Sequence, residues 1–193
     1  MTDPYELETR FSQQDGMAYI ENIFDVPSEE SLDVLDRLRD IIENLPPREA
    51  DFVDLYYFKK KKQTDIAAIF GVSQPTVCYR LQRATARIQF LLQLPEIGVK
   101  EIEEAMDDFL DDPLDVKIMT LMYSTTCQSE VGKKLGVSQG KIRHRFIRSI
   151  EKMKKYEEME HFAELFEIIS NNLNILREVR RSSKSDPTIF SLD

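Results

Sequence analysis

Residues 63–83 read QTDIAAIFGVSQPTVCYRLQR and carry the clearest structural pattern of the chain. Apolar residues at helical spacing are followed by Gly71, which has the backbone freedom that a tight turn needs. Ser73 can cap the next helix with its hydroxyl, and Pro75 suits the first turn because its missing N–H is not needed there. Ala67 is small, so the two helices can cross closely. The stretch therefore predicts a helix-turn-helix, with an outward face of Gln74, Thr76, Cys78, Tyr79, Gln82 and Arg83.

The same pattern occurs a second time at a shift of 65 residues, without a gap. Residues 128–149 read QSEVGKKLGVSQGKIRHRFIRS, so the Gly-Val-Ser-Gln turn at 71–74 recurs at 136–139. The small residue at the helix crossing recurs as Gly132. Repetition at so many structurally assigned positions predicts a second helix-turn-helix unit. Three polar residues also recur, with Gln63, Arg80 and Arg83 matching Gln128, Arg145 and Arg148.

Helical periodicity around both stretches predicts an all-α fold. Residues 28–45 place their leucines and isoleucines on one stripe, and the prolines at 46 and 47 end that helix. Residues 48–58 continue to the first helix-turn-helix and are expected to turn Phe52, Val53, Leu55 and Tyr56 toward the core. We expect two tandem helix-turn-helix units of three to four helices each, plus a long C-terminal amphipathic helix. The expected boundaries are 1–27 for an acidic N-terminal tail, 28–94 and 95–155 for the two units, 156–181 for the amphipathic helix and 182–193 for a tail.

The C-terminal region keeps apolar residues at a spacing of three and four well beyond residue 149. The second helix of the repeat either runs on into this region or breaks near residues 170–172. The apolar face of residues 156–181 either packs on the rest of the chain or forms the seam of a homodimer or of another partner complex. The sequence leaves both choices open.

The formal net charge of the chain is −9, but the charge alternates along the sequence. Residues 48–94 carry 8 basic and 4 acidic side chains, and residues 117–155 carry 10 and 2. Residues 1–47 and 95–116 are by contrast strongly acidic. Phosphate contacts depend on the local field rather than on the total charge, so this distribution suits a chain that binds DNA through its two basic segments.

The first outward residues of the second helix in each pair are candidates to read base edges in the major groove. The amides of Gln74 and Gln139 can pair with adenine. Arg83 or Arg143 can pair with guanine, and the methyl group of Thr76 can contact a thymine methyl. These five side chains are therefore candidates to give a sequence preference.

Other outward residues are expected to contact the DNA backbone. Tyr79 and His144 can reach either a base or a phosphate. The lysines at 59–62 are either a solvated loop or a further phosphate contact. Cations that give affinity without sequence choice are expected at Arg80, Arg145, Arg148, Lys133, Lys134 and Lys141.

The sequence offers little for catalysis, so we expect no enzyme, no cofactor and no metal. The two histidines, His144 and His161, have no metal-ligand or triad spacing. The acids of residues 101–112 are expected to be a solvated surface, a surface for a basic partner, or a mimic that competes with DNA for the chain's own basic face. Cys78 and Cys127 either form a disulfide or stay reduced, and the reduced form is expected. No signal peptide or membrane-length apolar run is present, so we expect a cytoplasmic location.

Three further features carry a resemblance to a known family. They are Leu-Pro-Pro-Arg-Glu at 45–49, Tyr-Tyr-Phe at 56–58, and DIAAIFGVSQPTVCYRLQRATARI at 65–88. Together they resemble region 4 of bacterial sigma-70-type factors, which reads the −35 promoter element and docks on RNA polymerase. The resemblance covers residues 45–90 well and residues 110–153 in a degenerate form, where Gly140 replaces the proline. It implies double-stranded DNA and RNA polymerase as partners.

The resemblance does not imply a complete sigma factor. Residues 1–47 are acidic and contain no tryptophan, so we do not expect a promoter-melting domain. The expected function is a sequence-specific transcription regulator that binds DNA through one or both units. A further hypothesis is that the first unit docks on polymerase while the more basic second unit holds DNA. One alternative is an interaction protein that binds polymerase with little affinity for DNA. Another is a DNA-packaging or recombination accessory factor, such as a small terminase subunit.

Overall fold

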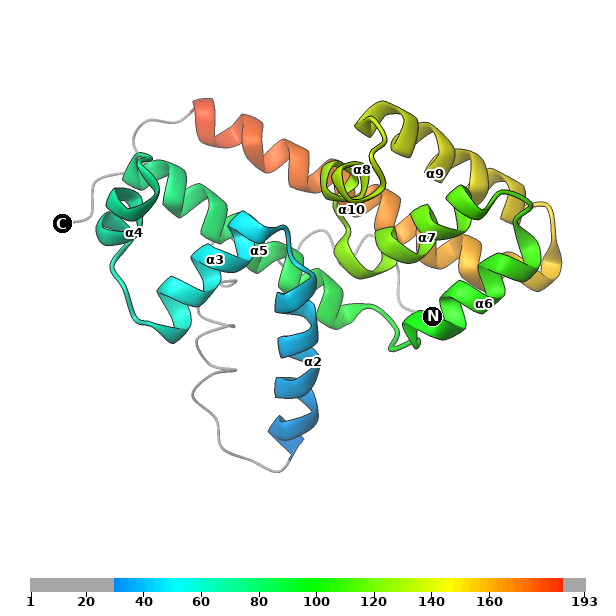
Figure 1. Cartoon of the computed structure of the whole chain (residues 1–193), viewed down its shortest axis with the longest axis horizontal. Helices are drawn as coiled ribbons and strands as arrows, with labels where there is room; N and C mark the ends of the chain where they lie inside the picture. The colour runs from blue at the N-terminus through cyan, green and yellow to red at the C-terminus, as the bar shows by residue number, and fades with distance from the viewer. Residues whose placement is uncertain (1–29, 186–193) are drawn as a thin grey trace. The chain divides into compact units, whose positions relative to one another are not determined.

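The computed structural model describes residues 30–185, and residues 1–29 and 186–193 lie outside the description. The predicted N-terminal tail therefore falls outside it. Every regular element of the described residues is a helix, with no strand among them (Figure 1), so the prediction of an all-α fold is confirmed. The chain divides into two compact units, Met1–Gln93 and Leu94–Asp193, which are described separately below as unit 1 and unit 2.

Unit 1 is built around the longest of its described helices, α5, which α2, α3 and α4 all contact (Figure 1). Pro47 opens α3, where a proline costs no hydrogen bond. Phe52, Ile66, Val77 and Leu81 are fully buried between these helices. The bounds are α2 at Glu30–Asn44, α3 at Pro47–Val53, a π-helical turn η2 at Asp54–Phe58, α4 at Gln63–Phe70 and α5 at Gln74–Gln93.

The π-helical turn changes which residues of the segment before α4 face the core. Lys59 N–H donates to the carbonyl of Asp54 at 2.9 Å, a bond that spans five residues instead of four. The wider turn rotates the following side chains relative to an α-helix. Phe52 and Val53 are buried as predicted. Of the three aromatic residues at 56–58, however, Tyr57 is the one that is buried in the core, whereas Tyr56 is half-buried, as is Leu55. The predicted inward position of Leu55 and Tyr56 is therefore only partly right.

The described part of unit 2 contains five α-helices and a short 3-10 helix. Pro113 opens α7, and the side chain of Asp112 caps that helix by accepting the Leu114 N–H at 2.9 Å. Ile118, Met119 and Phe146 are fully buried. The bounds are α6 at Val99–Phe109, α7 at Pro113–Thr125, α8 at Gln128–Leu135, α9 at Gln139–Met153, η3 at Glu157–Met159 and α10 at Glu160–Ser185.

The chain reverses between α9 and α10, and neither of the predicted alternatives is right. The helix neither runs on past residue 153 nor breaks near residues 170–172, which lie inside α10. Instead Tyr156 has an extended backbone, with φ −127° and ψ 121°, and its ring packs edge-on against Phe109 at 5.2 Å. The break contains no glycine or proline, so burial of the apolar residues on both sides determines it rather than a local signal.

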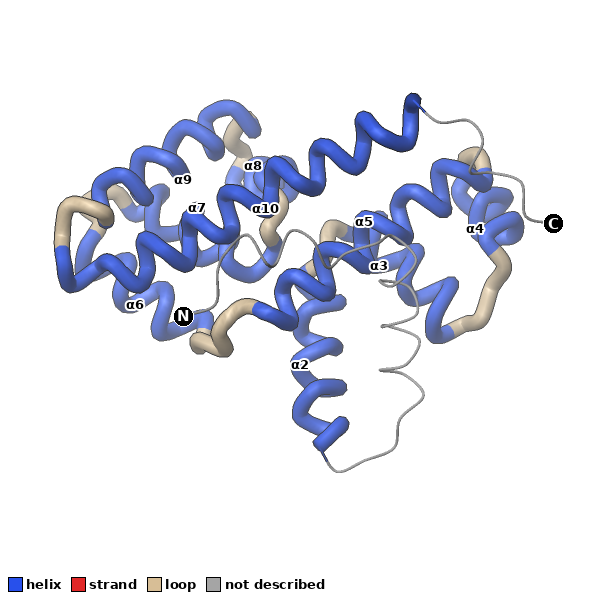
Figure 2. The backbone as a smooth tube through the Cα atoms, turned by 180° about the vertical axis from the view of Figure 1, so that it is seen from behind, coloured by secondary structure: helices blue, strands red, loops and turns tan. Residues whose placement is uncertain are grey.

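The first part of α10 packs on its own unit. Figure 2 shows α10 beside α9 and α7, and it contacts both of them. Phe166 is fully buried and meets the Phe146 ring edge-on at 5.9 Å, while Phe162 and Ile169 are also buried. This part of the predicted dimer seam is therefore occupied within the chain. Side chains beyond residue 173 lie outside the description, and a homodimer stays a prediction.

Candidate nucleic-acid interface

The turn between α4 and α5 forms as its sequence predicts. Gly71 ends α4 in the left-handed conformation, with φ 62°. Val72 N–H then donates to the Ala67 carbonyl at 3.0 Å, and Ser73 Oγ accepts the Thr76 N–H at 3.4 Å. A glycine is favoured at position 71 because a residue with a side chain would be strained at this φ.

The turn between α8 and α9 has the same geometry. Gly136 has φ 65°, Val137 N–H donates to the Gly132 carbonyl at 2.8 Å, and Ser138 Oγ accepts the Lys141 N–H at 3.4 Å. A Cβ atom on Gly132 would lie 2.6 Å from the Val137 carbonyl oxygen, which is closer than real Cβ atoms approach. The small residue that the helix crossing requires is therefore a glycine in unit 2.

Side chains on the outer face of α5 are largely engaged within unit 1. Gln74 Nε2 donates to Gln63 Oε1 at 2.7 Å, and the hydroxyls of Thr76 and Ser73 are 2.8 Å apart. The guanidinium of Arg80 lies over the Phe52 ring, 5.4 Å from its centre. Tyr79 is half-buried as well, and among the described residues nothing accepts or donates a hydrogen bond at its buried hydroxyl oxygen.

A buried carboxylate on α3 holds two arginines of α5. Glu49 Oε2 accepts from Arg87 Nε at 2.9 Å, and Glu49 Oε1 lies 3.4 Å from Arg83 Nε without hydrogen-bond geometry. The Arg87 side chain is only 1% exposed, so this ion pair is part of the core. The sequence prediction missed the pair. The one sequence feature that points to this ion pair is the charge of Arg87, which lies on the buried face of the helix between Ala84 and Leu91.

The start of α9 presents its polar side chains to solvent. Gln139, Lys141, Arg143 and His144 are all exposed, and a Cβ atom added to Gly140, which lies between them, would meet nothing within 4 Å. The exposed Lys133 and Lys134 lie at the end of α8, where Lys133 Nζ is 3.4 Å from Glu130. These side chains form a basic surface that a DNA groove could contact directly.

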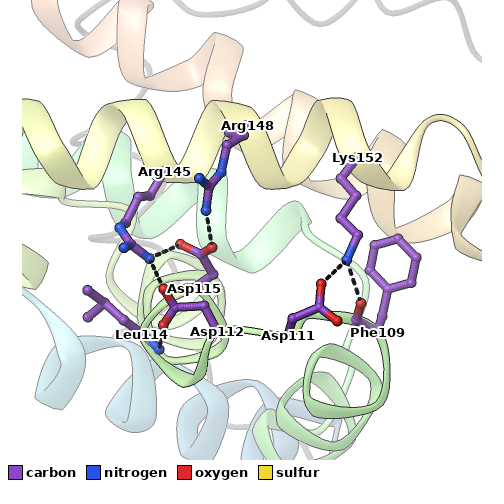
Figure 3. Close-up of polar contacts among 8 residues, drawn as sticks. All are labelled: Phe109, Asp111, Asp112, Leu114, Asp115, Arg145, Arg148 and Lys152. Atoms are coloured by element: carbon purple, nitrogen blue, oxygen red, sulfur yellow. Dashed lines mark hydrogen bonds and ion pairs between the residues drawn. The ribbon is translucent and has the colours of Figure 1, made fainter.

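Further along α9, three cations are paired with carboxylates near the start of α7 (Figure 3). Arg145 Nη1 donates to Asp112 at 2.6 Å and to Asp115 at 2.8 Å. Arg148 Nη2 donates to Asp115 at 2.6 Å. Lys152 Nζ donates to Asp111 at 2.9 Å and to the Phe109 carbonyl at 3.1 Å, with its charge 4.9 Å from the Phe109 ring centre.

These ion pairs change the electrostatics of the predicted phosphate contacts. Hydrogen bonding from Lys152 lowers the pKa of Asp111, and hydrogen bonding from Arg145 lowers the pKa of Asp112. Both carboxylates are therefore ionised at neutral pH. The sequence predicts Arg145 and Arg148 as phosphate anchors, and the structure places both against internal carboxylates instead of leaving them free. Two sequence features point to this arrangement: the acidic run around Pro113, and the basic residues of α9, which recur at helical spacing.

The described residues contain no metal-binding group or membrane span. Among them, no cluster of three or more histidine, cysteine, aspartate or glutamate side chains could hold a metal ion. None of the helices within the described range is both long enough and apolar enough to cross a bilayer. Cys78 and Cys127 are free thiols.

The fold and the turn geometry define unit 1 as a helix-turn-helix domain with a long second helix. Comparison with known proteins adds that residues 35–88 match the family model described as sigma-70, region 4. No curated protein matches the chain, and no solved structure does. Unit 1 is therefore similar to sigma-70 region 4. The match ends within α5, so the predicted tandem arrangement of two such units stays a prediction.

Proposed function

We propose that the protein is a sequence-specific DNA-binding transcription regulator that acts with RNA polymerase and is not an enzyme. The observation that carries this proposal is the match of residues 35–88 to sigma-70 region 4, over a correctly formed helix-turn-helix. Domains of this family in general bind DNA and RNA polymerase. Both partners are therefore the first to test.

Within this proposal, α9 of unit 2 is the main DNA-reading helix and unit 1 contacts polymerase. The difference in exposure supports this division, because Gln139, Arg143 and His144 are exposed whereas Gln74 and Arg83 are half-buried in contacts of their own. Arg143 is the expected reader of guanine and Gln139 of adenine. The phosphate contacts come from Lys133, Lys134 and Lys141, which flank the same surface.

The proposal is tested by selecting bound sequences from a random pool of duplex DNA, with the full chain alone and with core RNA polymerase. We expect one enriched motif that polymerase strengthens. Enrichment without any effect of polymerase would leave a free-standing DNA binder and remove the polymerase part of the proposal. No enrichment under either condition would contradict sequence-specific binding.

A second candidate function is a polymerase-binding protein with little affinity for DNA. The engagement of Gln74, Arg80 and Arg83 within unit 1 favours it, since the helix-turn-helix that matches the family has few free side chains for DNA. In this case the chain would co-purify with core polymerase, and the DNA selected with polymerase present would be the same with and without the chain.

A further inference from the structure

One face of α9 carries a continuous row of four cations. Lys141, Arg145, Arg148 and Lys152 follow one another at spacings of four, three and four residues, which places them on one stripe of the helix. Lys141 is exposed and makes no ion pair among the described residues, whereas the other three are paired. The row begins beside the exposed side chains proposed to read DNA, so a phosphate backbone that meets Lys141 would continue toward the paired cations.

The carboxylates that face this row differ in how easily they could be displaced. Asp115 is buried, with its side chain 6% exposed, and it holds both Arg145 and Arg148. Asp111 is 96% exposed and Asp112 is 44% exposed. A buried carboxylate cannot leave without exposing its site, but an exposed one can be replaced by another anion at little structural cost.

We propose that Asp111 and Asp112 act as an internal phosphate mimic, which occupies Lys152 and Arg145 and so limits the number of DNA phosphates that α9 contacts. This inference rests on the proposed DNA binding by α9. Asp115 has a different role and fixes α9 to α7 whether or not DNA is bound. The mimic sets non-specific affinity, because a phosphate must compete with a tethered carboxylate for each cation.

The charge and position of the two carboxylates meet the requirements of such a mimic. Each is ionised at neutral pH, since its pKa lies below its usual value through hydrogen bonds from Lys152 and Arg145. Each contacts its cation at 2.9 Å or less, as a phosphate oxygen would. Lys152 and Arg145 keep a second acceptor each, the Phe109 carbonyl and Asp115, so they stay in place when the exposed carboxylate is replaced.

The test uses the full chain with the double substitution Asp111→Asn and Asp112→Asn. An asparagine at 112 can still cap α7, so the helix start is preserved. The matched control is Asp107→Asn with Asp108→Asn, which removes two exposed charges of α6 that make no ion pair among the described residues. Binding to random duplex DNA is measured from low to moderate salt, and thermal unfolding of each variant establishes that it is folded.

We expect the Asp111/Asp112 variant to bind random DNA more tightly than the control, with a slope of log affinity against log salt that is steeper by about 0.9 for each additional phosphate that α9 binds. Adding Lys152→Ala should remove part of this increase in affinity, whereas Lys152→Ala alone should change the slope little. Equal affinities and slopes for the two double variants would overturn the mimic while leaving DNA binding intact. If even the unmodified chain binds no DNA, the proposed function fails first, and the mimic fails with it.

Discussion

The second helices of the two pairs, α5 and α9, follow turns of the same geometry but expose different amounts of their outer faces. At α5, Gln74 and Arg80 are half-buried and hold partners within unit 1. At α9, the equivalent Gln139 is exposed, whereas Arg145 is held by carboxylates. The turn therefore fixes how two helices cross, while the surrounding helices decide which side chains remain available for a partner.

The helices that precede the two pairs differ in register by one residue. Equivalent residues in these preceding helices are related by a shift of 66 residues, whereas the two turns are related by a shift of 65. Unit 1 therefore has one more residue than unit 2 between its left-handed residue and the next helix, which is α4 in unit 1 and α8 in unit 2. Both left-handed residues lie just after a helix, with φ 51° in unit 1 and φ 43° in unit 2. The equivalent residues are the opening prolines Pro47 and Pro113, the acids Glu49 and Asp115, and the left-handed residues Lys60 and Thr126.

In both units, the acid near the start of the preceding helix holds basic residues of the second helix. In unit 1, Glu49 pairs with Arg87, whose side chain is fully buried. In unit 2, Asp115 pairs with Arg145 and with Arg148, which is more than half exposed. The pairing is thus a core contact in unit 1 and a boundary contact in unit 2, so the same substitution should have unequal effects in the two units.

Loss of the buried Glu49–Arg87 pair of unit 1 should reduce stability the most. Replacing Arg87 by alanine leaves Glu49 buried without its main partner and should reduce the free energy of unfolding by about 3–5 kcal/mol. Urea unfolding measures this directly. The control is Arg39→Ala, which removes an exposed pair with Asp36 and should cost less than about 1 kcal/mol. Equal losses for the two variants would refute a core role for the Glu49–Arg87 pair.

The next effect concerns which unit supplies the phosphate contacts. Replacing Lys133, Lys134 and Lys141 by alanine should make the fall of log affinity with log salt less steep by about 2.7. Each phosphate that is no longer bound contributes about 0.9 to this slope. The control removes the same charge from unit 1 through alanines at Lys60, Lys61 and Lys62. A smaller change is expected there. If the two triple variants flatten the slope equally, the phosphate contacts are not concentrated in unit 2.

A smaller effect tests the helix crossing. Gly132→Ala places a methyl group against the Val137 carbonyl and should cost about 1–3 kcal/mol, less any gain in helix propensity. Gly140→Ala is the matched control, because a Cβ there meets nothing within 4 Å, and it should stabilise the unit by about 0.5–1 kcal/mol. Thermal unfolding distinguishes the two. A stable Gly132→Ala variant would show that α8 and α9 do not cross as closely as the structure has them.

Local signals allow much of the fold to be predicted, and long-range contacts account for most of what the sequence does not reveal. Gly71 and Gly136 mark both turns because a left-handed residue at a helix end strongly favours glycine. The Glu49–Arg87 pair joins residues 38 positions apart, and nothing in the local pattern of either residue specifies the other. The reversal after α9 lacks glycine and proline, so only the packing of α10 reveals it.

The candidate DNA-contacting residues are predicted from their outward positions on the helices. In the structure they fall into two groups, those that are exposed and those that other side chains hold. Lys141, Arg143 and His144 remain exposed, while Arg145 is held by Asp112 and Asp115. A helical pattern identifies which face a side chain occupies but not whether another element covers that face. The availability of Arg145 therefore depends on α7, which the pattern of α9 alone does not include.

One selection experiment distinguishes reading of the DNA sequence by α9 from reading by α5. Full-length Arg143→Ala and Gln74→Ala variants are compared with the unmodified chain on the motif selected from random DNA and on random DNA itself. We expect Arg143→Ala to lose about 1–3 kcal/mol of binding free energy on the motif, to relax the preference at one or two base pairs and to change binding to random DNA little, whereas Gln74→Ala should leave the motif unchanged. The opposite result, with the motif altered by Gln74→Ala and unaffected by Arg143→Ala, would show that α5 and not α9 reads the DNA sequence.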